Sequence, residues 1–456
     1  MSANKVLWGI CVGAVALIWL PNLLTKGMFM DGVINAVVAE NLANGVGSFY
    51  HLKDYNFPNN NYTGHPPLAF QLQGFFFKGF GAAHYMERVY SLLCLLIQLL
   101  LITQIWKQLQ TKSELASSAL PVLFFISSPL VVWCYSNNLL ENTMCIFTTS
   151  SVVWMLRYEA NKNGCWISAL FSGLLLMAAL LSKGPVGLFV LAAPILLLSN
   201  KKKAVLYTFV MIAAVVVTAI CLQLANADFT AMLSNYYREQ LSGSFYKNEE
   251  NILLRFSIWG KLLLYTLPMV LLWALSVWLR KEKPAAYPLA LPMILLGLCG
   301  SLPLIISHKQ SAFYFLPAMP FFAMGFALLS AQTFDEILHR LPLYATKVSM
   351  VVCGGVICIS LILCIGNKDK IMRDLDLITD AKEVAQICKT PHLNTNWGLS
   401  ERWHFRAYLY RYHKKVLCFP DKPCSTNWYL TPAREDSNPS MLHLYSGSQF
   451  NLYTKL

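Results

Sequence analysis

Residues 201–223 read KKKAVLYTFVMIAAVVVTAICLQ, in which three lysines precede twenty residues without a charge. An α-helix rises about 1.5 Å per residue, so about twenty apolar residues cross the roughly 30 Å hydrocarbon core of a bilayer. The stretch therefore predicts a membrane-spanning helix with a basic end.

The composition extends this prediction to the whole chain. Of its 456 residues 56% are hydrophobic and only 13% are charged, whereas a soluble domain carries about 25% charged residues. The formal net charge of +13 would indicate a nucleic-acid partner in a soluble protein. Here the basic residues lie in short clusters between apolar runs and no nucleic-acid motif is present, so we expect an all-α polytopic membrane protein and no nucleic-acid partner.

About eleven spans are expected. The first apolar run follows Lys5 and has no small-residue cleavage site after it, which favours an uncleaved span over a signal peptide. The two runs on either side of Lys183 are short for a complete crossing. The expected spans lie near residues 6–25, 87–106, 115–133, 141–157, 166–181, 185–199, 204–223, 259–279, 286–306, 312–330 and 347–366.

The basic residues also predict the orientation. One set of loops is short and densely basic, and the positive-inside rule places it in the cytoplasm together with the N-terminus. The opposite set includes the long segments 26–86 and 224–258 and the tail 367–456, which we expect on the outer, extracytoplasmic face. The basic loops hold Lys5, Lys107, Lys112, Arg157, Lys162, Lys201, Lys202, Lys203, Arg280, Lys281, Lys283, Arg340 and Lys347.

Two domains are expected. Residues 1–366 form the transmembrane domain, and its outer loop 26–86 carries two helices. The first helix runs from Asp31 to Asn44 and ends at a glycine-rich turn. The second begins at Pro66-Pro67, and its aromatic content with one basic end is typical of a helix in the membrane interface.

The tail 367–456 alternates charged, apolar and aromatic residues and is long enough for a small α/β domain. Short strands are expected at Val416–Phe419 and Asn427–Leu430. Cys418 and Cys424 can form a short-loop disulfide if the tail faces an oxidising space.

Two acids lie at outer ends of spans. Asp31 follows the first span and is either the N-cap of the next helix or a carboxylate at the outer membrane face. Glu141 begins the fourth span, where an acid also favours the helix dipole. Both acids lie at outer ends of spans, so they can converge on one functional site at the outer face.

Several cations and imidazoles map to the same face. Lys183 interrupts an apolar stretch and is either a lysine that snorkels from an outer turn or a cation that holds an anionic headgroup. Such a face suits a reaction at a lipid-linked phosphate, because cations stabilise a leaving phosphate and a carboxylate accepts a proton from an acceptor hydroxyl. The other residues of this set are His65, Arg88, His308 and Lys309.

The motifs resemble those of the GT-C membrane glycosyltransferases, in the branch of the aminoarabinose transferases of lipid A and the protein O-mannosyltransferases. Asp31 with its helix resembles their first acidic motif, and Gly64-His65-Pro66-Pro67-Leu68 resembles Lys-Pro-Pro-Leu. Residues 181–187 resemble a Thr-Lys-Gly-Pro stretch, and 307–320 resemble a segment with Lys-Leu-Pro, Tyr and Leu-Pro. The span that begins at Glu87-Arg88 resembles the family's second span.

This resemblance implies an inverting transfer from a polyprenyl-phosphate sugar, in the bacterial inner membrane, to a lipid A-like glycolipid, a polysaccharide or a protein. It makes Asp31 and Glu141 the candidate catalytic residues. It makes His65, Arg88, Lys183, His308, Lys309 and Tyr314 the candidate substrate-binding residues.

The chain departs from the family at two places. Gly32, Ile34 and Asn35 replace a second acid and an Arg-Tyr pair, and His65 replaces the lysine before Pro-Pro. A neutral histidine holds phosphate less well than a lysine but can ligate a metal. A divalent metal ion therefore stays open as a cofactor, with Asp31, Glu141 and His65 as its candidate ligands.

A polytopic membrane protein with these features has two alternative functions, a transporter and a scaffold. A transporter or flippase for a charged lipid or sugar is disfavoured because the sequence has no internal repeat and its charges lie at span ends. A non-catalytic membrane scaffold whose outer tail binds a partner is also disfavoured, because it would not need the cluster of charged residues at the outer face.

Overall fold

The computed structural model describes residues 2–55, 61–109, 117–160, 166–242, 255–280, 288–307, 309–342, 344–433 and 441–455. The chain divides into two compact units. The helical unit contains Met1–Pro21, Thr63–Ala69 and Ser91–Gly366. The sheet unit contains Asn22–Tyr62, Phe70–Tyr90 and Asn367–Leu456.

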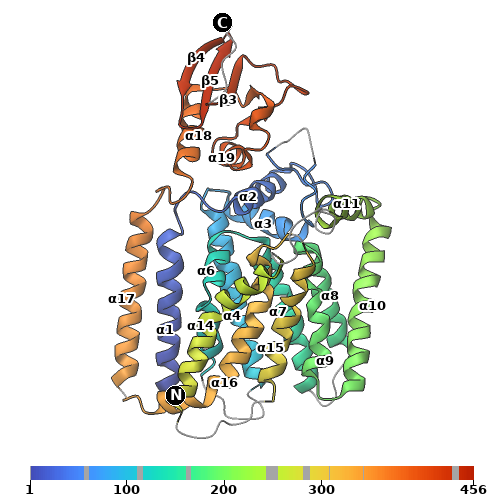
Figure 1. Ribbon diagram of the computed structural model, residues 1–456, viewed down its shortest axis with the longest axis vertical. Helices are drawn as coiled ribbons and strands as arrows, with labels where there is room; N and C mark the ends of the chain where they lie inside the picture. Colours follow the sequence, from blue (N-terminus) through green and yellow to red (C-terminus); the bar gives the residue numbers. More distant parts are fainter. Residues whose placement is uncertain are drawn as a thin grey trace. The chain divides into compact units, whose positions relative to one another are not determined.

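The helical unit is built from long apolar helices and short helical pieces (Figure 1). Its α-helices are α1 Ser2–Trp19, α4 Met86–Leu109 (whose residues up to Tyr90 belong to the sheet unit), α5 Leu120–Ile126, α6 Pro129–Ser136, α7 Leu140–Ala160, α8 Ile167–Lys183, α9 Ala193–Leu197, α10 Lys201–Ala225, α11 Asp228–Tyr236, α14 Ser257–Leu279, α15 Ala290–Cys299, α16 Met319–His339 and α17 Tyr344–Gly366. The shorter turns are η1 Leu20–Asn22, η3 Pro185–Ala192, η4 Tyr237–Ser242, η5 Leu302–Ile306 and η6 Ala312–Ala318.

Within the described ranges, six helices are long and apolar enough to cross a membrane, and a seventh span results if the bent pair α6 and α7 counts as one. The chain is thus a multi-pass membrane protein, as predicted. The spans expected at 115–133, 166–181, 185–199 and 286–306 fall on shorter helical pieces. The count of eleven therefore stays a prediction.

The helices differ in how much of their surface the protein covers. In α16 together with the turn before it, 78% of the most apolar 18-residue stretch is buried inside the protein. In α10 and in α17 the corresponding share is 17%. Apolar side chains that the protein leaves uncovered on a hydrophobic helix are suited to lipid contact. We therefore read α16 as an inner helix and α10 and α17 as lipid-facing ones.

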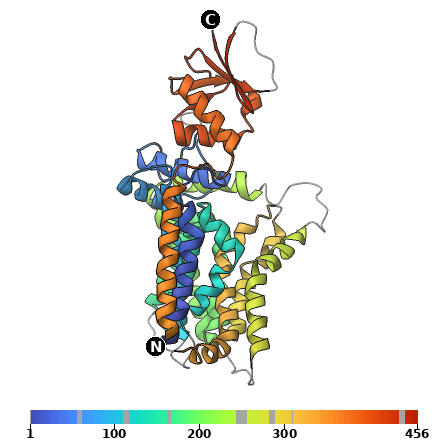
Figure 2. The ribbon, with the colours of Figure 1, turned by 90° about the vertical axis from the view of Figure 1, so that its left-hand side faces the viewer.

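Close helix pairs hold this unit together. Helices α1 and α17 pack side by side in both views (Figures 1 and 2). Helix α8 packs against α7 and α10. A Cβ at Gly173 would lie 2.6 Å from the Ala214 Cβ, so the approach of α8 to α10 depends on a glycine.

The sheet unit combines two helices from the N-terminal loop with a C-terminal α/β domain. The loop supplies α2 Met30–Ala43 and most of α3 Leu68–Phe80, which confirms both expected helices. The C-terminal domain has α18 Leu375–Ile387, α19 Trp403–His413 and a sheet in the order β2-β1-β3-β5-β4. The strands are β1 His392–Thr395, β2 Val416–Cys418, β3 Trp428–Pro432, β4 Met441–Ser446 and β5 Phe450–Lys455.

Strand alternation places the core of this domain on one face of its sheet. The strands β2, β1 and β3 run parallel, and β3, β5 and β4 are antiparallel. Alternate side chains point to one face, where they pack with Ala381 and Val384 of α18 and with Phe405 and Leu409 of α19. These sheet residues include Leu393, Leu417, Leu430 and Leu452.

This architecture confirms the expected α/β tail. The predicted strands Val416–Phe419 and Asn427–Leu430 coincide with β2 and β3. The Cys418–Cys424 disulfide is formed.

Candidate functional site

Lys183 is the last residue of α8, at a backbone position that its neighbour controls. Gly184 has φ +101°, a conformation that only glycine adopts without strain, and Pro185 follows. The hydroxyl of Tyr236 donates a 3.2 Å hydrogen bond to the Lys183 carbonyl. The helix therefore stops at Lys183 and leaves its side chain inside the protein.

The Lys183 ammonium is buried and paired. Its Nζ lies 3.1 Å from Oε1 of Glu141, and the two side chains are only 4% and 0% exposed. Glu141 lies in the first turn of α7, as predicted. The snorkelling interpretation of Lys183 is therefore wrong, because the ammonium lies next to an interior carboxylate that offsets its desolvation.

His65 completes this group from the loop before α3. Its Nε2 lies 3.3 Å from the Lys183 Nζ. Burial, followed by the charges of Lys183 and Lys309, lowers the pKa of His65 well below its usual value. A neutral ring that accepts a hydrogen bond from the ammonium at Nε2 carries its own proton on Nδ1.

The turn η6 supplies an aromatic wall. The Lys183 Nζ lies 5.5 Å from the ring centroid of Phe313 and 5.7 Å from that of Tyr314. Ring faces attract a cation at this range. The ammonium is thus held by a carboxylate, an imidazole and two rings, all from the helical unit.

A cavity of about 510 Å³ opens beside this group and reaches Lys309. Its wall is mostly apolar, with side chains such as Val186, Leu188, Phe189 and Leu304. Its polar lining comes from His65, Lys183, Tyr236, Gln240, Ser307, Lys309 and Tyr314. The Lys309 ammonium donates a 2.6 Å hydrogen bond to Oε1 of Gln240. A pocket with apolar walls and a few cations suits an amphipathic anion.

Sequence reasoning identified Lys183, Glu141, His65, Lys309 and Tyr314 as candidate site residues, and the structure brings all five to one region. Gln240 and Tyr236 were missed. Their segment, 224–258, was recognised only as a long loop, and no local pattern connects it to Lys309 or Gly184. His308 lies outside the described residues.

Asp31 and Arg88 belong to the sheet unit. Asp31 lies inside the first turn of α2, whose N-cap is Phe29. The N-cap interpretation of Asp31 is therefore wrong, because the helix begins one residue earlier, at Met30. The convergence of Asp31 with Glu141 stays a prediction.

Arg88 fixes the segment that leads to Asp31. Its two terminal nitrogens donate hydrogen bonds to the carbonyls of Thr25 and Gly27. The side chain is buried. Its place is therefore structural within the sheet unit, and its substrate-binding role stays a prediction.

Helix α19 holds the same segment from the C-terminal domain. The Tyr408 hydroxyl lies 3.0 Å from the Met28 amide and 2.8 Å from the Met28 carbonyl. The Tyr412 hydroxyl accepts a hydrogen bond from the Gly27 amide at 3.1 Å. Sequence reasoning noted these tyrosines only as part of an aromatic-rich tail, because their partners lie more than 370 residues away.

A second buried ion network lies in the sheet unit. Arg411 of α19 pairs with Glu40 of α2 at 3.1 Å and with Glu87 at 2.8 Å. It also donates to the carbonyls of Ala82 and Ala83. Burial alone would lower the pKa of Arg411, but the two carboxylates raise it above its usual value. Arg411 therefore stays charged.

No group of three or more His, Cys, Asp or Glu side chains with metal-ligating geometry occurs in the described part of the chain. Glu141 and His65, two of the predicted metal ligands, both contact the Lys183 ammonium. In this arrangement the lysine supplies the positive charge between them. Metal dependence stays open to experiment.

Comparisons with known proteins agree with this geometry. Residues 64–225, which include His65, Glu141 and Lys183, match the family model described as dolichyl-phosphate-mannose-protein mannosyltransferase. The comparison with curated proteins finds no match.

Solved structures with a similar fold include ArnT from Cupriavidus metallidurans bound to undecaprenyl phosphate, with a TM-score of 0.67, 14% identity and 98% of each chain covered. Its apo state gives a TM-score of 0.66 at 13% identity and the same coverage. The oligosaccharyltransferase AglB from Archaeoglobus fulgidus gives 0.47 at 10% identity, over 93% of this chain and 69% of that one. The match to ArnT shows that the chain has the GT-C fold, which the resemblance in its sequence predicted.

Proposed function

We propose that the protein is an inverting glycosyltransferase that moves a sugar from a polyprenyl-phosphate donor to an acceptor at the outer face of a bacterial inner membrane. The observation that carries the proposal is the buried Lys183 at the wall of a largely apolar cavity, with Lys309 on the same cavity. The ArnT structure with undecaprenyl phosphate supports the choice of donor.

The cavity matches both parts of such a donor. Apolar walls suit the prenyl chain, and the two lysines suit the phosphate. In the transfer, the bond between the anomeric carbon and the phosphate oxygen breaks, and the electron pair leaves with the polyprenyl phosphate. Lys183 and Lys309 stabilise the charge that develops on that oxygen.

The neighbours of Lys183 stabilise its ammonium and fix its position. The Glu141 carboxylate lies 3.1 Å from the ammonium and offsets its desolvation, and neutral His65 accepts a hydrogen bond from it without adding a competing charge. The rings of Phe313 and Tyr314 limit where the ammonium can move. These contacts pre-organise one donor toward the leaving phosphate, which is the arrangement that lowers a transition-state barrier.

Asp31 is the proposed base. Its carboxylate takes the proton of the acceptor hydroxyl as the acceptor oxygen bonds to the anomeric carbon from the side opposite the phosphate. This direction of attack inverts the anomeric configuration. The hydrogen bonds of Arg88, Tyr408 and Tyr412 to residues 25–28 fix the backbone just before Asp31.

The acceptor hydroxyl belongs to a glycolipid such as lipid A, a polysaccharide or a protein. The transporter alternative is less well supported, because the family model and the ArnT structure are both those of transferases. A transporter would move the donor intact and release no polyprenyl phosphate.

The test is a transfer assay on purified protein in detergent, with radiolabelled polyprenyl-phosphate sugars and extracted envelope lipids as substrates. We expect label to reach an acceptor with wild-type protein, and transfer to be lost with Asp31→Asn. A chelator arm measures metal dependence. Folded protein that transfers no sugar from any donor, or an Asp31→Asn variant with full transfer, would overturn the proposal.

A further inference from the structure

The C-terminal domain contains a pocket that the proposed chemistry does not use. We name it the sheet pocket; it has a volume of about 420 Å³, and it is lined by residues of the three parallel strands and of β5. The lining residues that carry the argument are Asn396, Phe419, Tyr429, Thr431, Tyr453 and Lys455.

Part of the pocket lining lies on the sheet face opposite α18 and α19. Leu430 and Leu452 point into the core beneath those helices. Side chains alternate along a strand, so Thr431 and Tyr453 point to the opposite face. Asn396 and Phe419 come directly after β1 and β2, at the carboxyl ends of parallel strands, where open α/β sheets commonly bind ligands.

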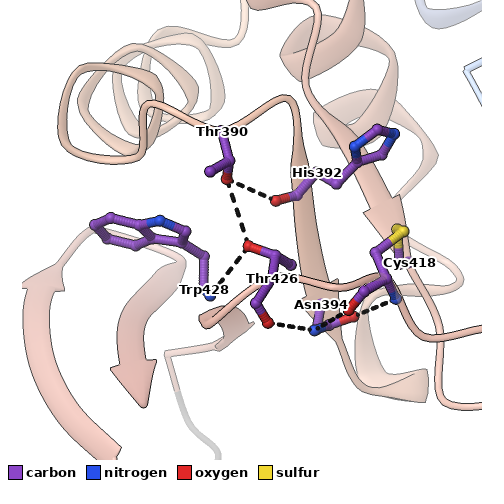
Figure 3. The surroundings of a disulfide bond; sticks show 7 residues. Thr390, His392, Asn394, Cys418, Thr426 and Trp428 are labelled. Carbon is purple, nitrogen blue, oxygen red and sulfur yellow. Dashed lines mark hydrogen bonds between the residues drawn. A yellow bond between two sulfur atoms is a disulfide. The ribbon is translucent and has the colours of Figure 1, made fainter. Parts of the chain in front are cut away.

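The rim of the pocket is fixed before any ligand arrives. The Cys418–Cys424 disulfide closes the loop that follows β2. The Asn394 amide donates to the carbonyls of Cys424 and Thr426 at 3.1 and 3.0 Å, and its oxygen accepts from the Cys424 amide at 2.9 Å (Figure 3). A pre-organised rim reduces the entropy lost on binding.

One buried hydroxyl in the pocket is not used by the fold. Thr431 is 5% exposed, and its Oγ1 has no hydrogen-bond partner among the described residues. The neighbouring Thr395, by contrast, donates to the Leu430 carbonyl at 2.9 Å. A buried polar atom without a hydrogen bond destabilises the fold, so a ligand group that bonds to Thr431 would remove a penalty present in the free protein.

The lining selects a neutral, hydroxyl-rich ligand. Among the described residues, it contains hydroxyl and amide side chains and the two tyrosines, no carboxylate, and a single cation, Lys455. Outside the lining, Trp397 stacks on the lining residue Phe419, with ring centroids 5.4 Å apart, and is 57% exposed. Aromatic rings together with hydroxyl and amide groups suit the C–H face and the hydroxyls of a sugar ring.

We propose that the sheet pocket is a glycan-binding site that recognises a short neutral saccharide. The role of that saccharide as part of the acceptor rests on the proposed function, whereas saccharide binding itself does not. The site belongs to the C-terminal domain alone and is separate from the cavity at Lys183.

The test uses the full-length protein in detergent without donor. Maltotriose, cellotriose, chitotriose and mannobiose are titrated, and binding is followed by isothermal calorimetry and by the fluorescence of tryptophan. We expect at least one saccharide to bind with a dissociation constant of about 1 mM or tighter.

Thr431→Val is the discriminating variant. It removes a hydroxyl that the free fold does not use, so we expect an unchanged or higher melting temperature together with binding weakened about tenfold. Trp397→Ala should also weaken binding. Thr454→Val is the matched control, because Thr454 lies on β5 outside the pocket lining, and it should leave binding unchanged.

Two results would overturn the proposal. One is that no saccharide of the panel binds to folded wild-type protein. The other is that Thr431→Val lowers the melting temperature and leaves binding intact, which would mean that the hydroxyl serves the fold. Saccharide binding without any transfer would contradict the proposed function only, and transfer without saccharide binding would contradict the sheet pocket only.

Discussion

Lys183 and Arg411 are both buried cations paired to buried carboxylates, but their surroundings differ. The Arg411 guanidinium divides its terminal nitrogens among Glu40, Glu87 and two backbone carbonyls, which joins α19 to two other parts of the sheet unit. Lys183 pairs with the Glu141 carboxylate, contacts the neutral imidazole of His65 and borders a mostly apolar cavity.

Under the proposed function, this difference separates a buried charge that serves the fold from one that binds a ligand. A planar guanidinium with two carboxylates is a strong cross-link between segments. A lysine that lines an apolar cavity can interact with an anion bound there. Under the proposed function, a buried ion pair is therefore structural in the sheet unit and binds phosphate in the helical unit.

The largest expected effect tests the structural half of this comparison. Arg411→Met leaves Glu40 and Glu87 buried beside one fewer cation, and breaking a buried pair in this way costs about 3–5 kcal/mol. Thermal unfolding in detergent should show a clearly lower melting temperature. Adding Glu40→Gln and Glu87→Gln to Arg411→Met should restore most of the lost stability; an unchanged melting temperature in the single variant would contradict the cross-link.

The next effect tests the functional half. The double variant Lys183→Met with Glu141→Gln removes both charges of the pair together, so neither is left buried without the other, and the melting temperature should stay close to that of the wild type. Transfer should fall by about 10²–10³-fold, the usual loss when one pre-organised donor to a developing charge is removed. The measurement is the initial transfer rate of the double variant compared with that of the wild type. A near-normal rate would rule out a phosphate-binding role for Lys183.

A smaller effect is expected at the turn that positions Lys183. In Gly184→Ala the new Cβ would lie 2.2 Å from the Tyr236 hydroxyl, at a φ of +101°. Strain of this kind costs about 1–3 kcal/mol, so both the melting temperature and the transfer rate should fall. Tyr236→Phe in the same protein should recover part of the loss.

Gly260→Ala is the control for this prediction, because nothing lies within 4 Å of the position of its Cβ. It should leave the melting temperature unchanged or slightly raised, since alanine favours a helix more than glycine does. If both glycine variants behave alike, the turn does not control the site.

The smallest effect concerns pH. Burial and the charges of Lys183 and Lys309 lower the pKa of His65 in the folded protein below its usual value of 6.5. Below this pH the unfolded chain binds the proton and the folded chain does not, so stability falls as the pH is lowered. Melting temperatures between neutral and mildly acidic pH should fall less in His65→Gln than in the wild type.

The exposed His339 supplies the control for the pH series, because its side chain is 73% exposed. His339→Gln should follow the wild-type pH curve. A His65→Gln curve that also follows the wild type would mean that His65 titrates normally in the folded protein.

The local patterns predicted the elements well. The helix from Asp31 to Asn44, the helix after Pro66-Pro67 and the strands near Val416 and Trp428 all appear close to their predicted positions. Residues 115–133 were predicted as one span but form α5 and α6, because Pro129 cannot continue the preceding helix. Hydrophobicity alone does not register such a break.

The candidate site was predicted less completely. Lys183, Glu141 and His65 stood out because ionisable residues are costly in or beside apolar spans. Their mutual distances, and the parts played by Gln240 and Tyr236, depend on segments far apart in the chain. Arg411, Tyr408 and Tyr412 gave no signal as ion-pair and hydrogen-bond partners, because a soluble-looking helix can carry such residues on its surface.

The sequence by itself determined that the chain is a multi-pass membrane protein with a small C-terminal α/β domain, because hydrophobic length, proline placement and strand alternation are local properties. It also singled out Lys183 and Glu141, because isolated charges are rare beside apolar runs. Only the tertiary structure decided that these two residues pair inside the protein, that Arg411 cross-links the sheet unit, and that Thr431 lines a pocket. Each of these facts depends on contacts between distant segments, and such contacts are set by packing, which no local pattern encodes.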